Sequence, residues 1–467
     1  MRPAYRDVPE FSAIEAVTND QPAAAPTSAA PLWEQPGITS WTVARLFLDA
    51  LRRADTLVLP SADGDVGYFM SALGHERRGH GAGLSRSVIA ASEPPAELLA
   101  YHRTLGLAPT RFYCPLQTSH TTPLAKRVLE EAALMERIRA DRFLTRMFVA
   151  FKDRSAELLM ERLGLAPVYC APSASVYETA NDKLELVRAA AEYGFAVVAM
   201  EAANDIEDLA GVFAALSRQH GRGCVLRRRR GAGGHGIYRA RSAAAARRIW
   251  QRLHAGGDVV VAPYIPAERV LRDVAVHGIV TADGFAPLAF ADQLVSNQRF
   301  RGGRVSDDWT AEEIAAVSDT MQGVARWLRD LGYVDAPAGV DGFLMRQEGV
   351  LRFVALDPNI RLTGTTLPWT VAATLSEAAG RRFVWQVESF RIIGTALDFD
   401  QVRRRLGEDL LSVARLDRGG ILPSVLSTTI HVGALAASHL RAILLAHDRA
   451  HLDFLRSRIR RLGILMP

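Results

Sequence analysis

The sequence predicts an α/β protein in which a parallel sheet precedes a series of antiparallel hairpins. Short apolar runs alternate with helical patterns over the first third of the chain, which is typical of a doubly wound parallel sheet. Later runs are longer and are joined by the turn pairs Asp283-Gly284 and Glu348-Gly349, which indicate hairpins. A glycine-rich turn between two strand-like runs separates these halves.

Composition limits the class of protein. The 467 residues, 49% of them hydrophobic, are enough for two to four domains with substantial cores. A net charge of +5 is too small to indicate a nucleic-acid partner. The three cysteines form no CxxC pair, so neither a zinc ribbon nor a disulfide framework is expected. Without a membrane-length apolar run or a signal pattern, we expect a cytoplasmic protein that binds no membrane.

The N-terminal region divides into a leader and an α/β domain. Residues 1–40 are expected to form a flexible leader, because Pro, Ala and Ser dominate its second half. Residues 41–174 are expected to form the parallel α/β domain. A helical pattern covers Thr122–Met147. Strands are expected at Thr56–Leu59, Ser87–Ala91, Arg111–Cys114 and Pro167–Cys170.

The next unit is expected to span residues 175–255. The stretch NDKLELVRAAAEYG predicts a helix that Asn181 or Asp182 caps and Gly194 ends. A strand over Phe195–Met200 and a helix over Ile206–His220 should follow. The stretch CVLRRRRGAGGHGIYRA then predicts a strand, a glycine-rich turn and a second strand.

Two units should complete the chain. Residues 256–395 contain alternating strand patterns, a long helix over Ala311–Leu331 and a last hairpin whose second half reads LRFVALDPNIRLTG. Residues 396–467 are expected to form a C-terminal extension. Its Leu and Ile spacing predicts an amphipathic helix over Ala436–Ile459, which offers a surface for a homodimer.

The glycine-rich turn is a candidate phosphate-binding loop. Glycines permit positive φ and close approach of the backbone, and successive N–H groups can form an anion-binding concavity. His235 in the same turn is placed to touch a terminal phosphate. A merely flexible hairpin is the alternative. The glycines concerned are Gly231, Gly233, Gly234 and Gly236.

Acidic and amide side chains near the last hairpin form a candidate magnesium site. Asp357 and Asn359 are two residues apart on an extended segment, so both should point to one face. Asp341 is expected to begin the neighbouring strand. Two carboxylates and an amide suit Mg²⁺ that also binds substrate phosphates. Arg361 continues the alternation, and a turn-and-cap role for Asp-Pro-Asn is the alternative.

Taken together and in this order, these motifs resemble the ATP-grasp superfamily. The series is NDK, CVLR, RGAGGHGI, VVVAPYI, a "VD" strand and an acid-x-Asn strand, and it covers about residues 175–395. The α/β region before it resembles the accompanying Rossmann-like pre-ATP-grasp domain. The segment DPNIRLTGTTLPW is most similar to the pheganomycin-type peptide ligases. The resemblance implies a two-subdomain (α+β) ATP-grasp fold, with ATP and Mg²⁺ as cofactors.

The resemblance also implies residue roles. Lys183 and Arg227 would hold the ATP phosphates, and the glycine-rich turn would form a flap above them. Backbone groups of Pro263, Tyr264 and Ile265 would bind adenine. Mg²⁺ would be held by Asp341, Asp357 and Asn359. Arg361, with Asp357 and Asn359, would make up the catalytic group by stabilising the acyl phosphate and the tetrahedral intermediate.

Some positions depart from the family pattern. Arg227 stands where the family usually has lysine, and Arg keeps the charge without the compact ammonium. Ala262 replaces the hinge glutamate, and Glu268 is the candidate to replace its contact. Asp357 is one methylene shorter than the usual glutamate. Leu367 precedes Pro368 where histidine is usual.

The implied activity is ATP-dependent ligation of a carboxylate to an amine, through an acyl phosphate, with amino acids or peptides as partners. Amide or peptide bond formation in specialised, natural-product metabolism is expected. One alternative is an inactive core whose RRRR run binds polyphosphate or nucleic acid, although strand alternation exposes only half the run on one face. Another is an ATP-grasp carboxylase or kinase. The basic segment 297–304 is a candidate loop for a substrate carboxylate.

Overall fold

The structure is a computed structural model that describes residues 41–466 apart from nine short gaps. The gaps are residues 61–83, 118–121, 169–171, 221, 232–235, 255–257, 297–298, 394–396 and 433–434. The expected leader, residues 1–40, therefore lies outside the described residues, as do Gly233, Gly234 and His235. No helix in the described ranges is long and apolar enough to cross a membrane.

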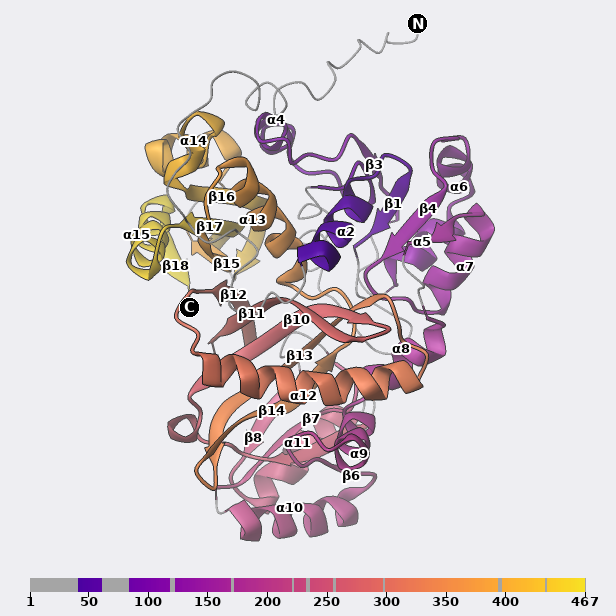
Figure 1. The fold of residues 1–467 in the computed structure, drawn as a ribbon, viewed down its shortest axis with the longest axis vertical. Coiled ribbons are helices and arrows are strands. Elements are labelled where there is room, and N and C mark those ends of the chain that lie inside the picture. Colours follow the sequence, from indigo (N-terminus) through magenta and orange to yellow (C-terminus); the bar gives the residue numbers. More distant parts are fainter. Residues whose placement is uncertain are drawn as a thin grey trace, which may run out of the picture.

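A five-stranded parallel sheet occupies the N-terminal region, in the order β3-β2-β1-β4-β5. This confirms the parallel sheet that the alternating pattern predicts. Figure 1 shows it at one end of the molecule beside the C-terminal elements. The strands are β1 (Thr56–Leu59), β2 (Ser87–Ile89), β3 (Arg111–Tyr113), β4 (Arg146–Val149) and β5 (Ala166–Pro167). The helices are α2 (Trp41–Arg52), α4 (Ala96–Thr104), α5 (Leu124–Glu130), α6 (Ala132–Arg139) and α7 (Arg154–Leu163).

The single helix expected over Thr122–Met147 is wrong. The segment forms α5 and α6 and then enters β4, which pairs with β1 over four residues. Buried Met147 and Phe148 share their apolar character with the residues of a helical core face. A short buried strand carries no periodicity that distinguishes it from the end of a helix.

A four-stranded antiparallel sheet follows, in the order β6-β9-β7-β8. Its strands are β6 (Glu201–Ala203), β7 (Cys224–Arg228), β8 (Ile237–Ala240) and β9 (Val259–Pro263). The helices in this region are α8 (Ala174–Ala180), α9 (Lys183–Tyr193), α10 (Ile206–His220) and α11 (Ala243–His254). The strand expected over Phe195–Met200 is wrong: Val197 makes one isolated bridge, to Ala355, and β6 begins at Glu201.

A sheet of nine described strands forms the centre and the C-terminal end, in the order β14-β13-β10-β11-β12-β15-β17-β16, with β18 added to β15. Its first strands are β10 (Arg272–Thr281), β11 (Gly284–Ser296), β12 (Arg299–Val305), β13 (Ala336–Gln347) and β14 (Val350–Asn359). The rest are β15 (Val384–Ile393), β16 (Gly420–Val432), β17 (Leu435–Ala446) and β18 (Ile464–Met466). The helices are α12 (Ala311–Asp330), α13 (Thr366–Ala378), α14 (Phe399–Leu406) and α15 (Arg449–Ile459).

The C-terminal helix expected over Ala436–Ile459 is wrong in its first half. That half is β17, which pairs with β15 and β16, and the helix α15 begins only at Arg449. Alternate β17 residues enter two different cores, Ile443 and Leu445 on one face and Leu440 and Leu444 on the other. A strand buried on both faces is apolar throughout, so its spacing can be mistaken for a helical one.

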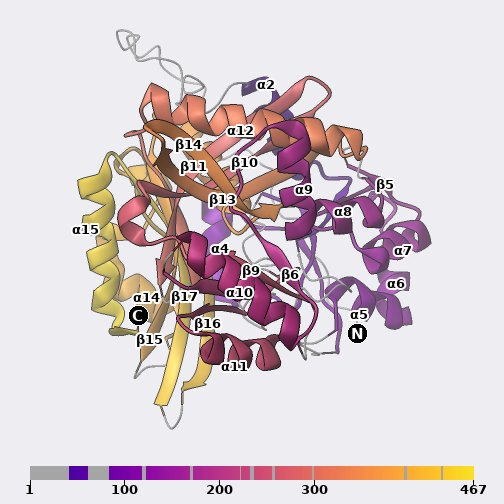
Figure 2. The same ribbon diagram turned by 90° about the horizontal axis from the view of Figure 1, so that it is seen from below.

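The two antiparallel sheets face each other across an apolar layer. Val198, Met200, Val260 and Ala262 pack in one cluster with Met345 and Val354 of the large sheet. Figure 1 shows the small sheet with α10 and α11 at the end of the molecule opposite the parallel sheet, and Figure 2 views the molecule from that end. The two sheets therefore meet along this apolar cluster.

Candidate functional site

The start of α9 projects a lysine toward the large sheet. Asp182 caps the helix by accepting a hydrogen bond from the Leu184 N–H at 2.9 Å. Lys183, the first residue of the helix, is only 1% exposed. Its Nζ lies 2.9 Å from Oδ1 of Asp357. A buried ammonium is therefore held against the acid at the end of β14.

Arg227 reaches the same carboxylate from the opposite sheet. The residue lies in β7, and one of its terminal nitrogens donates to Oδ2 of Asp357 at 2.5 Å. Burial works against ionisation of Asp357, but the adjacent Arg227 and Lys183 charges hold its pKa below the ordinary value. Burial in turn lowers the pKa of Lys183 to about 8, although Asp357 favours its charged form. Two cations expected at ATP phosphates thus converge on one carboxylate.

Asp341 and Asp357 are direct cross-strand neighbours. The pair sits in the antiparallel ladder of β13 and β14, immediately before a bulge between Asp341 and Gly342. Asp341 lies inside β13, which begins at Ala336, so the expectation that it begins the strand is wrong. Burial raises the pKa of Asp341 to about 7, and the charges of Asp357 and Asp273 act in the same direction. The ionised carboxylate of Asp357 thus disfavours ionisation of Asp341.

Asn359 and Arg361 extend this cluster. The Asn359 side chain donates a hydrogen bond to the Asp341 carboxylate. Its Oδ1 accepts from a terminal nitrogen of Arg361 at 2.5 Å. Arg361 is 3% exposed but lies beyond the end of β14 at Asn359. Strand alternation therefore does not explain the position of Arg361, which must depend on another contact.

That contact is Asn181, a residue that sequence reasoning considered only as a helix cap. Asn181 Oδ1 accepts from the Ile360 N–H at 3.0 Å, and Asn181 Nδ2 donates to the Ile360 carbonyl at 3.0 Å. The same Oδ1 accepts a hydrogen bond from Arg361. Asn181 thereby holds both the backbone and the guanidinium just after the candidate metal strand. Its place beside Asp182 and Lys183 was the available signal.

The arginine run before the glycine-rich turn is largely engaged within the chain. Arg227 binds Asp357, and Arg229 lies 2.7 Å from Asp182 with Glu185 and Asp258 also in range. Arg230 lies 3.4 Å from Asp182. In the turn itself, Gly231 and Gly236 are described, and Gly236 has a φ of +79°, a region that favours glycine.

The expected adenine segment follows β9. The Tyr264 N–H donates to the Gly223 carbonyl at 3.1 Å, and Ile265 packs against the apolar layer between the sheets. Pro263 ends β9, and Ala262 is buried in that layer. The Arg239 guanidinium lies 3.4 Å from the centre of the Tyr264 ring. The expected contact residue Glu268 is exposed and ion-paired with Arg222.

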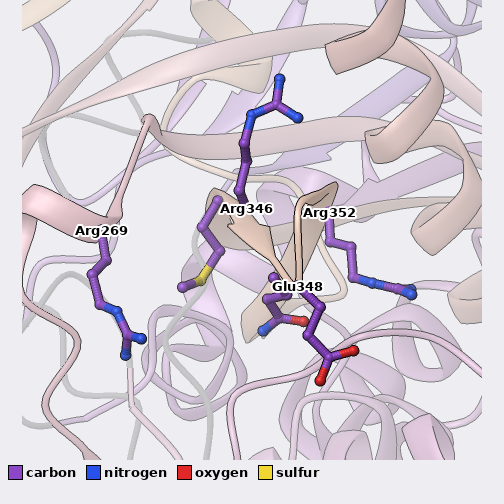
Figure 3. Close-up of a pocket in the computed structure, with 6 residues that line it drawn as sticks. Arg269, Arg346, Glu348 and Arg352 are labelled. Atoms are coloured by element: carbon purple, nitrogen blue, oxygen red, sulfur yellow. The ribbon is translucent and has the colours of Figure 1, made fainter.

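A cavity of about 480 Å³ opens near this segment, at the tip of the β13–β14 hairpin. Met345 joins it to the apolar layer between the sheets. Figure 3 shows Arg269 facing the hairpin, whereas Arg346 and Glu348 point to opposite sides. Arg346 reaches Glu312 at 3.2 Å. Because its charged side chains diverge, the cavity is not built around an anion. Its lining is Arg269, Met345, Arg346, Gln347, Glu348 and Arg352.

The donor set suits a hard cation that brings phosphates with it. The described residues contain no group of three His, Cys, Asp or Glu side chains arranged for a metal. Asp341, Asp357 and Asn359 instead supply two carboxylates and an amide, which are oxygen ligands. Mg²⁺ is bound in this way, through few protein ligands and several oxygens from substrate or water. The residues therefore fit Mg²⁺ accompanied by a nucleotide.

The run after Arg361 is fixed by a buried histidine in β10. His277 Nδ1 lies 2.9 Å from Oγ1 of Thr363, and its Nε2 lies 2.5 Å from Oγ1 of Thr365. Complete burial lowers the pKa of His277 to about 3, which keeps the ring neutral. Leu367, at the start of α13, is buried in the core. The threonine run is thus anchored to the central sheet.

The fold is shared with solved structures of a biotin carboxylase domain, a carboxyaminoimidazole synthase and an L-amino acid ligase. No protein-family model matches the sequence, and no curated protein matches it either. Several solved enzyme structures, however, match over most of the chain. The likeness lies at 11–14% identity in the three cases below, so it shows a shared fold.

Three of these structures define the likeness. The biotin carboxylase domain of 2-oxoglutarate carboxylase from Hydrogenobacter thermophilus, in complex with MgADP, ADP and bicarbonate, has a TM-score of 0.54 at 14% identity and covers 87% of this chain and 89% of its own. The L-amino acid ligase of Bacillus licheniformis has a TM-score of 0.53 at 11% identity, covering 89% and 99%. N5-carboxyaminoimidazole synthase from Aspergillus clavatus, with ADP and 5-aminoimidazole ribonucleotide, has a TM-score of 0.54 at 13% identity, covering 87% and 98%.

Proposed function

We propose that the protein is an ADP-forming, ATP-dependent carboxylate–amine ligase that makes an amide or peptide bond, with ATP and Mg²⁺ as cofactors. The observation that carries the proposal is the convergence of Lys183 and Arg227 on Asp357, beside Asp341, Asn359 and Arg361. Phosphate-binding cations and oxygen ligands for a metal thus meet between two sheets. A pheganomycin-type substrate range, with amino acids or peptides in natural-product metabolism, is the finer part of this proposal.

The regions take their roles from this proposal. Residues 41–174 act as the pre-ATP-grasp domain, and residues 175–255 carry the glycine-rich flap. Residues 256–395 carry the metal site, and residues 396–467 extend the central sheet. In this proposal Pro263, Tyr264, Ile265 and Glu268 would border the nucleotide. The glycine-rich turn would cover its phosphates through Gly231, Gly233, Gly234, His235 and Gly236.

The first step is attack of a substrate carboxylate oxygen on the γ-phosphorus of ATP. The bond from that phosphorus to the bridging oxygen breaks, so the products are an acyl phosphate and ADP. Lys183 and Arg227 exchange their contact with Asp357 for contacts with the phosphates, and so hold the transferred group in line. Asp341, Asp357 and Asn359 would hold Mg²⁺, which would neutralise charge on the phosphates.

In the second step an amine attacks the acyl carbon, and inorganic phosphate leaves as the amide forms. The developing oxyanion needs a fixed positive group, and Arg361 is held rigidly by Asn181 and Asn359. Such a preorganised donor stabilises the tetrahedral intermediate more than mobile water does. The substrate ammonium first loses one proton to solvent, because only the neutral amine can attack. A second proton leaves the nitrogen to solvent or to the departing phosphate as the amide forms, so the chain needs no covalent nucleophile.

The ion pairs disfavour the alternative of nucleic-acid or polyphosphate binding. Arg227, Arg229 and Arg230 each meet a carboxylate within the chain, so a nucleic-acid backbone would have to displace these partners. Salt-dependent binding should then be weak.

The test is a screen of amino-acid pairs for ADP release with ATP and Mg²⁺, followed by mass measurement of the product. A product lighter than the summed substrates by one water supports ligation. A phosphorylated or carboxylated product would replace the proposal with kinase or carboxylase activity. Steeply salt-dependent DNA binding without ADP release would favour the binding protein instead.

A further inference from the structure

One face of the C-terminal strands changes from apolar to basic along its length. In β15 and β17, Trp385, Val387, Ile443 and Leu445 enter the core shared with the parallel sheet. The intervening residues, such as Phe390 and Leu440, enter the core on the opposite face. Side chains alternate along a strand. The odd-numbered residues nearer the end of β15, and their partners near the start of β17, therefore continue the first face.

Those later residues are Ser389, Arg391, His439 and Arg441. The register pairs Ser389 with Arg441 and Arg391 with His439. Directly opposed residues have Cβ atoms roughly 5 Å apart, so two guanidinium groups and an imidazole share one small area. We call Arg391, His439 and Arg441 the basic face. Its nearest buried acid in the strand, Glu388, belongs to the other face, where it pairs with Arg456.

The basic face meets the segment that follows Arg361. Arg441 is 7% exposed, and a terminal nitrogen donates to the Gly364 carbonyl. Phe300 of β12 approaches the same glycine, because a Cβ placed on Gly364 would lie 3.1 Å from the Phe300 ring. A guanidinium and an aromatic ring therefore border the chain three residues beyond Arg361.

The carboxyl edge of the parallel sheet closes this region from the other side. The Leu362 N–H donates to the Ala150 carbonyl at 3.0 Å, just past the end of β4. The Ala150 N–H donates in turn to the Leu59 carbonyl, at the end of β1, at 2.9 Å. Open α/β sheets bind ligands at this edge. The segment 361–364 thus lies between a ligand-binding edge and the basic face.

We propose, resting on the ligase activity above, that the basic face binds the free carboxylate of the amine substrate, which is therefore an α-amino acid or a peptide rather than a simple amine. The carboxylate to be activated must lie at the γ-phosphate, beside Arg361. A second carboxylate requires its own cations, and arginine matches the planar carboxylate with two parallel hydrogen bonds. Arg441 is the principal contact, and Arg391 adds charge from the adjacent strand.

The test compares amine substrates that differ only in this carboxylate. Alanine, leucine, phenylalanine and glutamate are each measured against their α-carboxamides, by ADP release and by calorimetry with the nucleotide present. We expect the wild type to favour the free acids, with KM lower by roughly tenfold or more. R441Q and R391Q should raise KM for the acids by a similar factor and leave the carboxamides unaffected. Exposed Arg403 on α14 supplies the control R403Q, which should change neither.

The outcomes separate this inference from the ligase proposal. Equal use of acids and carboxamides, or equal effects of R441Q and R391Q on both, would overturn the inference while leaving ligation intact. If no pair releases ADP, the ligase proposal fails, and calorimetry still decides the inference. In that case, R441Q and R391Q variants that bind the free acids as tightly as the wild type would overturn the inference. R441K keeps the positive charge but cannot make two parallel hydrogen bonds to a carboxylate. Its affinity for the acids should therefore lie between those of R441Q and the wild type.

Discussion

At the scale of single residues, the candidate site depends on which side chains orient others. Arg361 is the group expected to act on the reacting atoms, and Asn181 fixes it together with the Ile360 backbone. Asn181 is buried and lies 179 residues from Ile360 in sequence. A hydrogen bond between such distant segments has no local sequence pattern.

Substitutions at these two positions should have distinct effects. R361A should lower kcat for ADP formation roughly 100-fold, as for the loss of one oxyanion donor. N181D keeps Oδ1 but loses the donor to the Ile360 carbonyl, so we expect a smaller loss of kcat with little change in the KM for ATP. Steady-state kinetics of both variants measure this split. Normal turnover by R361A at saturating substrate would contradict the assignment.

His277 predicts how stability depends on pH. Its folded pKa of about 3 lies below the unfolded value of about 6.5, so the unfolded chain binds more protons between these limits. This contribution is intact above pH 6.5 and falls as the pH drops toward 3, by ~2 kcal/mol at pH 5. Denaturant unfolding at pH 7 and 5 measures it. H277Q, which can still bond the threonines, should lose less stability over this interval than the wild type, and an equal loss would refute the explanation.

At the scale of elements, close contacts between strands set strict limits on side-chain size. Gly302 of β12 pairs with Glu388 of β15. A Cβ on Gly302 would lie 1.8 Å from the Val387 carbonyl oxygen. The strand pair that joins the central strands to the C-terminal strands therefore tolerates no side chain at this position.

G302A should destabilise the protein by ~3 kcal/mol, because backbone must move to admit the methyl group. The matched control is G211A in α10, where an added Cβ meets no atom within 4 Å. That change should stabilise the protein by roughly 0.5–1 kcal/mol through helix propensity. Thermal unfolding of both variants tests the contrast, and a G302A protein as stable as wild type would show that the strands separate easily.

The elements also show what a sequence can predict. The hairpin turn at Glu348-Gly349 correctly predicts that Asp341 and Asp357 lie on paired strands, because a turn is a local signal. It does not place Arg361, which lies past the strand end and depends on Asn181. The basic segment after Gln293 was expected as a loop, yet residues 299–305 form β12 between two strands. That pairing depends on β15, more than 80 residues away, and no local pattern reports it.

At the scale of the whole molecule, both antiparallel sheets contribute residues to the charge cluster. Arg227 comes from β7 of the small sheet, and Asp341 and Asp357 come from the large one. The apolar cluster that contains Ala262 and Val354 holds the two sheets together. A ligand that binds between the sheets should therefore restrain both of them.

Hydrogen exchange with Mg²⁺ and ADP tests this expectation. We expect amides in β7 and in β13–β14 to exchange more slowly together, because binding to the native state suppresses opening. K183M should abolish the protection in both sheets. R403Q, remote on α14, should preserve it. Protection confined to one sheet in the wild type would contradict a ligand site between them.

Asn181, Asp182 and Lys183 are consecutive, yet they bond to three separate parts of the chain: the Ile360–Arg361 segment, the base of the glycine-rich turn, and β14. Point substitutions can dissect these bonds one at a time. Inserting or deleting a single residue immediately before Asn181, at the junction of α8 and α9, would shift all three residues relative to their partners. The protein should therefore tolerate a change of chain length less well here than a change of a single side chain. Loop grafts or chimaeras should place their junctions elsewhere.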